Sequence, residues 1–135
     1  MSAEAIARLL DERAIEKLLV AYGALNDAGR FDDLAALFVE DGRFARPANP
    51  DRPIVGRAAI LETFRGRAPR TARHLICNVQ VTFTDEGTAT VRSTSVLTTK
   101  GEGGGANLSV GQFDDEVVKV DGRWLFRSRT GSSVI

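Results

Sequence analysis

Cysteine and histidine are nearly absent from this sequence, which contains a single Cys77 and a single His74. A lone cysteine excludes a disulfide within the chain, and one Cys with one His is too few for an ordinary zinc site, so no metal is expected. Because His74 is the only histidine, any proton transfer by an imidazole near neutral pH must use this residue.

An excess of charge of one sign is also missing, because 18 Lys and Arg residues balance 18 Asp and Glu residues. A balanced chain has no general attraction for nucleic acid or acidic membranes, so neither partner is expected. No apolar run approaches the length of a membrane span, and the first residues lack the basic and apolar regions of a signal peptide. We expect a cytoplasmic protein that folds as one domain over residues 1–135.

The first quarter of the chain has the pattern of a long helix, from about residue 3 to residue 27. Apolar residues recur at steps of three and four: Ile6, Leu9, Leu10, Ile15, Leu18, Leu19, Tyr22 and Leu25. Gly29 suits the left-handed position that ends a helix. We expect a short second helix, capped by Asp32 or Asp33 and reaching Phe38, and a third helix over residues 58–64.

A different pattern follows, in which apolar and polar residues alternate. This alternation predicts long strands over residues 71–83, 88–100, 108–120 and 123–130. An earlier strand is expected to begin at Arg43, after a turn at Asp41-Gly42. Helices followed by a meander of antiparallel strands favour an α+β fold with the helices on one face of the sheet. A long twisted sheet curves, so we expect a cone whose open mouth takes a small molecule.

Four stretches, in their order and spacing, resemble the SnoaL-like family of the nuclear transport factor 2-like superfamily. They are AYGALNDAGRFDDLAALF (21–38), VGRAAI (55–60), RHLICN (73–78) and VDGRWLF (120–126). The resemblance covers nearly the whole chain. It implies a cystatin-like roll, in which a strongly curved, mostly antiparallel sheet wraps around a long N-terminal helix and two shorter helices.

Within that family, the positions of Asp27 and His74 are similar to those in scytalone dehydratase, bile-acid dehydratase and lindane dehydrochlorinase. These are lyases without a cofactor, in which the His removes a proton and the Asp orients the His. The resemblance implies that Asp27, His74 and Arg129 are catalytic and that no cofactor is required. Asn26, which stands where scytalone dehydratase has a tyrosine, and the lack of a second histidine leave the substrate open.

The position of Asp27 is unusual on physical grounds as well. A carboxylate in the last turn of a helix faces the negative end of the helix dipole, at a cost of about 0.3–1 kcal/mol. Pairing with His74 would offset that cost. A solvated helix-end Asp and a structural His are the alternative interpretation.

Candidate substrate-binding residues have weaker signals. The hydroxyl of Tyr22 could enter the same cavity one helical turn deeper, or the ring could simply belong to the core. Asn78 could donate to a substrate oxygen, or be a strand-edge amide. Three phenylalanines are candidates for the pocket wall or the core: Phe38, Phe44 and Phe64.

The strand over residues 71–83 contains a conflict between its two faces. His74 and Asn78 share one face, whereas the apolar series from Leu75 to Phe83 occupies the other. Either a bulge shifts the alternation, or the apolar outer face is an oligomer interface. Arg127 and Arg129 also share a face by alternation, and both cannot easily be buried. We expect a homo-oligomer, a dimer or a trimer, that associates through the outer face of the sheet.

The sequence thus predicts a lyase or isomerase that needs no cofactor and acts on a small apolar, cyclic, polyketide-like or steroid-like compound. His74 would remove the proton, Asp27 would hold the imidazole, and Arg129 or Tyr22 would assist the developing charge. Two alternatives remain open: a binding protein or accessory subunit that uses the cavity without turnover, and an oligomerisation module.

Overall fold

The computed structural model describes all of residues 1–135. Its elements, in order, are α1 (Ala3–Ala28), α2 (Phe31–Ala35), β1 (Phe38–Ala45), β2 (Ile54–Val55), α3 (Arg57–Arg65), β3 (Ala72–Phe83), β4 (Thr88–Lys100), a 3₁₀ turn (Glu102–Gly104), β5 (Ala106–Val120) and β6 (Arg123–Ser133).

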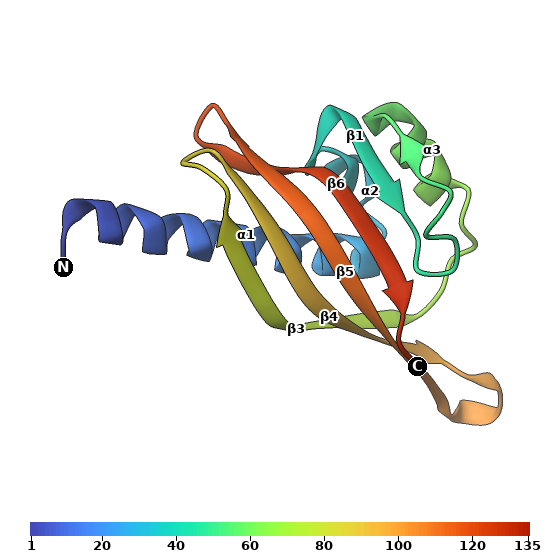
Figure 1. The fold of residues 1–135 in the computed structure, drawn as a ribbon. Coiled ribbons are helices and arrows are strands. Elements are labelled where there is room, and N and C mark those ends of the chain that lie inside the picture. The colour runs from blue at the N-terminus through green and yellow to red at the C-terminus, as the bar shows by residue number, and fades with distance from the viewer.

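The strands form one sheet in the order β2-β1-β6-β5-β4-β3. All neighbours are antiparallel except β1 and β6, which run parallel. Figure 1 shows α1 crossing one face of this twisted sheet, with α2 and α3 near the β1 side. The predicted α+β fold is confirmed, with a mostly antiparallel sheet, a long N-terminal helix and two short helices.

Helix α1 begins and ends as the sequence predicts. The hydroxyl of Ser2 accepts a hydrogen bond from the N–H of Ala5, and Gly29, with φ of 71°, ends the helix in the left-handed region. The apolar stripe, however, is buried only over its second half. Ile6 and Leu10 are 47% and 66% exposed, because this end of α1 projects beyond the sheet (Figure 1).

The expectations for the second helix were wrong in two respects. Helix α2 starts at Phe31 with no side-chain cap, so Asp32 and Asp33 lie inside its first turn. There the positive end of the helix dipole stabilises both carboxylates. Asp32 also forms an ion pair with Arg65, and Asp33 forms one with Arg30. Phe38 does not belong to α2, because it is the first residue of β1.

The expected turn at Asp41-Gly42 was also wrong, since both residues lie inside β1. The pairing of β1 with β6 changes register between Phe38 and Arg43. A bulge therefore produces the irregularity that the Asp-Gly pair suggested, and the strand continues through it.

Two further bulges resolve the conflict between strand faces. The pairing of β3 with β4 shifts between Cys77 and Gln80, where Asn78 has φ of 53°. His74 and Ile76 before the bulge, and Val79, Val81 and Phe83 after it, therefore form the more buried side of β3. Of the two alternatives, a bulge or an apolar oligomer interface, the structure contains the bulge.

The bulge in β6 has the same effect on its arginines. Its pairing with β5 shifts beside Arg127, because Glu116 pairs with Ser128 whereas Val117 pairs with Phe126. As a result Arg127 is exposed and Arg129 is fully buried, although strict alternation places them on one face.

Candidate active site

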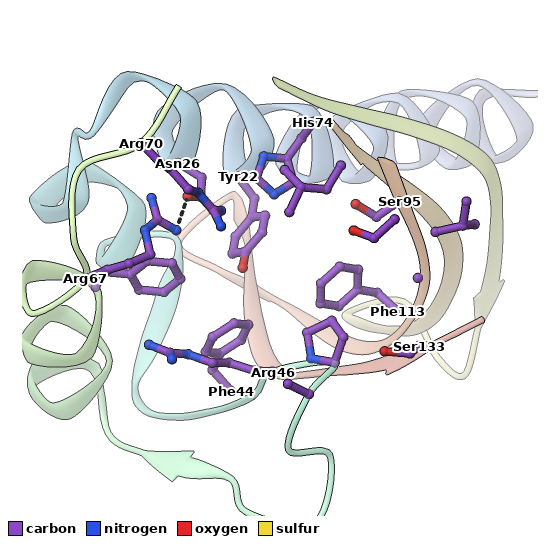
Figure 2. Close-up of a pocket in the computed structure, with 17 residues that line it drawn as sticks. Tyr22, Asn26, Phe44, Arg46, Arg67, Arg70, His74, Ser95, Phe113 and Ser133 are labelled. Carbon is purple, nitrogen blue, oxygen red and sulfur yellow. Dashed lines mark hydrogen bonds between the residues drawn. The ribbon is translucent and has the colours of Figure 1, made fainter. Parts of the chain in front are cut away.

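A cavity of about 340 Å³ opens at one end of the roll. Its wall comes from the second half of α1, the end of β1, the α3–β3 connection and the strands β3 to β6 (Figure 2). The volume lies at the lower end of the range for small-molecule sites. Aromatic rings form much of the wall, including those of Tyr22, Phe44, Phe64 and Phe113.

Asp27 and His74 meet directly at the edge of this cavity. Nδ1 of His74 lies 2.6 Å from Oδ1 of Asp27, and the backbone N–H of His74 donates to Oδ2 of the same carboxylate at 2.8 Å. Their side chains are only 8% and 5% exposed. Both carboxylate oxygens are therefore engaged by one residue, which fixes the carboxylate and the imidazole relative to each other.

This contact sets the tautomer of the imidazole. A carboxylate can only accept hydrogen bonds, so Nδ1 of His74 is protonated and donates its N–H to Asp27. Nε2 is then unprotonated and keeps its lone pair. His74 lines the cavity, whereas Asp27 does not. A residue of the cavity wall thus has one unprotonated imidazole nitrogen, while its other ring nitrogen is bound to a carboxylate.

Burial lowers the pKa of His74 below its usual value. Asp27 raises this pKa through its hydrogen bond and its charge, and the nearby cations of Arg70 and Arg67 lower it further. The imidazole is consequently neutral at pH 7, the form that accepts a proton.

The close approach of β3 to α1 depends on a glycine. A Cβ atom at Gly23 would lie 3.2 Å from Cβ of His74 and 3.7 Å from the side chain of Ile76. Gly23 precedes Asp27 by one helical turn, so both residues face β3. The missing side chain thus allows His74 to reach the carboxylate of Asp27.

Tyr22 lies in the wall of the cavity and is 2% exposed. Its ring contacts those of Phe44, Phe64 and Phe113 at centroid distances of 6.1–6.4 Å. Burial raises the pKa of the Tyr22 hydroxyl, which is therefore neutral at physiological pH.

Arg129, the third predicted catalytic residue, lies behind this wall and does not line the cavity. Its guanidinium is 3.8 Å from the ring centroid of Phe113 and 4.3 Å from that of Tyr22. Nη1 donates to Oδ2 of Asp115 at 2.6 Å, and both side chains are completely buried. Burial raises the pKa of Asp115 to about 7, although the charge of Arg129 acts in the opposite direction.

The other predicted site residues divide into two groups. Phe44 and Phe64 line the cavity, as does Tyr22, whereas Phe38 is fully buried and does not reach it. Asn78 lies in the β3 bulge, exposed, and its amide donates to Oγ1 of Thr94 at 3.4 Å. The structure therefore does not bring Phe38 or Asn78 to the cavity.

Several residues of the cavity were not predicted from the sequence. They include Asn26, which is 4% exposed, and three arginines, Arg46, Arg67 and Arg70. The segment 65–73 contains four arginines in nine residues. This density was a visible signal, but it does not indicate which of the four side chains face the cavity.

Metal ligands do not gather in this structure: no group of three or more His, Cys, Asp or Glu side chains could hold an ion. None of the helices is long and apolar enough to cross a membrane.

A family model described as the SnoaL-like domain matches residues 7–130. The chain belongs to the SnoaL-like family. Among curated proteins, none matches this SnoaL-like chain.

Solved structures similar to this SnoaL-like protein include three from Novosphingobium aromaticivorans. One, provisionally named scytalone dehydratase, is 31% identical with a TM-score of 0.87, over 97% of this chain and 89% of that chain. A second, described as NTF2-like with a cystatin-like fold, is 27% identical with a TM-score of 0.80, over 97% and 87%. A third, provisionally named aromatic ring hydroxylase, is 26% identical with a TM-score of 0.81, over 94% and 91%.

Proposed function

We propose that this protein is an enzyme, a lyase or isomerase that removes a proton from a small, mostly apolar, cyclic compound. The observation that carries the proposal is the contact between His74 and Asp27. It leaves a neutral imidazole with a free Nε2 at the wall of a cavity lined by aromatic rings.

The chemistry follows from that arrangement. Nε2 of His74 takes a proton from a carbon beside an activating group such as a carbonyl, and Asp27 stabilises the imidazolium that forms. In a dehydration, a C=C bond forms as the C–O bond of a β-hydroxyl breaks, and the imidazolium returns its proton to the departing oxygen as water. In an isomerisation, the proton returns to a different carbon.

Tyr22 and Arg129 assist in different ways. Tyr22 contacts the bound molecule from the wall of the cavity. Arg129 acts through Tyr22 as a positioning residue, since its guanidinium lies against the ring from the side away from the cavity. The similarity to a protein provisionally named scytalone dehydratase supports the lyase assignment.

The proposal predicts that His74→Gln and Asp27→Asn lower turnover while leaving the fold intact. We expect a loss of about 10²–10⁴-fold in kcat for His74→Gln, the usual contribution of a general base. The assay follows the ultraviolet absorbance of conjugated enones formed from a panel of cyclic β-hydroxy ketones, with circular dichroism to verify folding.

Thr82→Ala is the matched control, because Thr82 lies on the exposed side of the same strand. It should leave turnover unchanged. Full activity in a folded His74→Gln protein would contradict the proposal. Ligand binding without turnover by the unmodified protein would instead identify a binding protein with the same cavity.

A further inference from the structure

Three arginines converge on one side of the cavity. Arg46 follows β1, and Arg67 and Arg70 lie on the connection between α3 and β3. Figure 2 shows Arg67 and Arg70 near Asn26, and Arg46 below them near Phe44, with Ser95, Phe113 and Ser133 on the other side of the open space. Burial lowers the pKa of Arg67, and the positive charges of Arg70 and Arg46 lower it further, as expected for neighbouring cations.

No carboxylate neutralises this group. Each of the eight ion pairs in the structure is made by other residues. Arg67 donates through Nη1 to Oδ1 of Asn26 at 2.8 Å, which is a neutral partner, and its Nε is buried without any hydrogen-bond partner. The charge of Asp27 raises the pKa of Arg67, but this carboxylate is already engaged by His74.

Arg46 and Arg67 are half-buried and Arg70 is exposed. Like charges held together at partly buried positions repel one another, and an anion bound between them would relieve that repulsion. Guanidinium groups match the geometry of carboxylates and phosphates, to which they donate paired hydrogen bonds. The neutral Asn26 is significant here, because an aspartate in its place would neutralise Arg67 from within the protein.

We propose that the substrate of this cavity carries an anionic group, a carboxylate or a phosphate, which Arg46, Arg67 and Arg70 hold at one side. The apolar body of the substrate then lies among Phe44, Phe64 and Phe113, within reach of His74. The bound molecule is a substrate only if the proposed function holds, and to that extent this inference rests on it. The charge preference of the cavity does not depend on turnover.

The test compares three ligands that share one aromatic body: 2-naphthoate, 2-naphthyl phosphate and the neutral 2-naphthamide. Titration calorimetry should give a dissociation constant at least about tenfold lower for one of the anions than for the amide, as for a charge-assisted hydrogen bond. The tighter anion identifies the group that the arginines recognise. The NMR signals of His74, the only imidazole, should shift on binding and so locate the ligand in the cavity.

Substitutions then assign the preference to the cluster. Arg46→Gln and Arg70→Gln should each lower the affinity for the anion severalfold and leave that for the amide unchanged. Arg46 is only half-buried and Arg70 is exposed, so both variants should remain folded. The control is Arg123→Gln, an exposed arginine at the β5–β6 turn, which should bind all three ligands normally.

Two results would overturn the inference. One is an anion that binds no more tightly than the amide, including the case in which none of the ligands binds. The other is an equal loss in Arg123→Gln, which would indicate a general attraction of anions. His74→Gln separates the two proposals, because it should lose turnover and keep the anion preference. Full turnover in this variant, with the anion preference retained, would refute only the proposed enzyme.

Discussion

Asp27 occupies a helix position that electrostatics alone disfavours, and its contacts explain why it is stable there. It lies two residues before the left-handed Gly29, where the dipole of α1 is negative. Two donors from His74 compensate, the ring Nδ1–H and the backbone N–H. The same two contacts fix the tautomer of His74, so the pairing that stabilises Asp27 at the helix end also determines which ring nitrogen is free.

The pH dependence of turnover should reflect His74. Because burial lowers its pKa, the active neutral form should predominate at pH 7, and kcat should fall as the pH drops below the ordinary value of about 6.5. Asp27 raises this pKa, so Asp27→Asn should move the acid limb to still lower pH while reducing the plateau. An NMR titration of the single imidazole measures the same shift directly. An upward shift in Asp27→Asn would contradict the assigned contact.

At the scale of elements, the site depends on how closely β3 approaches α1. Gly23 is the point of contact, since a Cβ there would lie 3.2 Å from that of His74. The sequence shows a glycine within a helical pattern, where it costs about 1 kcal/mol relative to alanine. Only the packing against β3 explains this glycine, because a side chain at position 23 would crowd His74.

Gly23→Leu should therefore separate the two elements. We expect a loss of about 1–3 kcal/mol in the free energy of unfolding from overpacking, and a fall in kcat of about 10²-fold from displacement of His74. Urea denaturation and steady-state kinetics measure the two effects. Ala28→Leu, an exposed substitution on the same helix, is the control and should change neither. Normal turnover in Gly23→Leu would show that the approach is not needed.

At the scale of the whole molecule, the buried pair of Arg129 and Asp115 joins β6 to β5 inside the core. Nε and Nη2 of Arg129 and Oδ1 of Asp115 have no hydrogen-bond partner. The pair is therefore incompletely satisfied, and each charge depends on the other. Removing one partner leaves a buried charge, which is far more costly than losing an exposed pair.

Arg129→Met should lower the free energy of unfolding by about 3–5 kcal/mol at pH 8. The loss should be smaller at pH 5, because the pKa of Asp115, already raised to about 7, rises further without its cation and the carboxyl group is then protonated. Adding Asp115→Leu should recover much of the stability at pH 8. Urea denaturation at both pH values measures these differences.

Arg127→Met is the control for this series, because Arg127 pairs with Glu116 at 3.0 Å on the exposed side of the same two strands. Its loss should be about 0–1 kcal/mol. An equal loss for Arg129→Met at pH 5 and pH 8 would show that the charge of Asp115 is not the cause.

The homo-oligomer predicted from the outer face of the sheet stays a prediction. The bulge at Asn78 accounts for the apolar series from Val79 to Phe83, which lies on the more buried side of β3. The apolar series that suggested an interface is thereby explained by packing within the chain.

The sequence by itself determined the order of the three helices and the four long strands β3 to β6, the ends of α1 and the identity of the only imidazole. These follow from local properties, namely the period of apolar residues, the preference of glycine for positive φ and the residue count. The family resemblance added the pairing of Asp27 with His74, which lie 47 residues apart.

Tertiary structure alone decided which residues reach the cavity. Bulges at Asn78 and Arg127 reverse the alternation within β3 and β6, and their positions depend on pairing with neighbouring strands. The arginine cluster is likewise formed by segments that only the closed roll brings together. Alternation with a period of two predicts which residues share a face of a strand. One inserted residue exchanges the two faces beyond it, and the packing of the whole sheet decides where that residue is inserted.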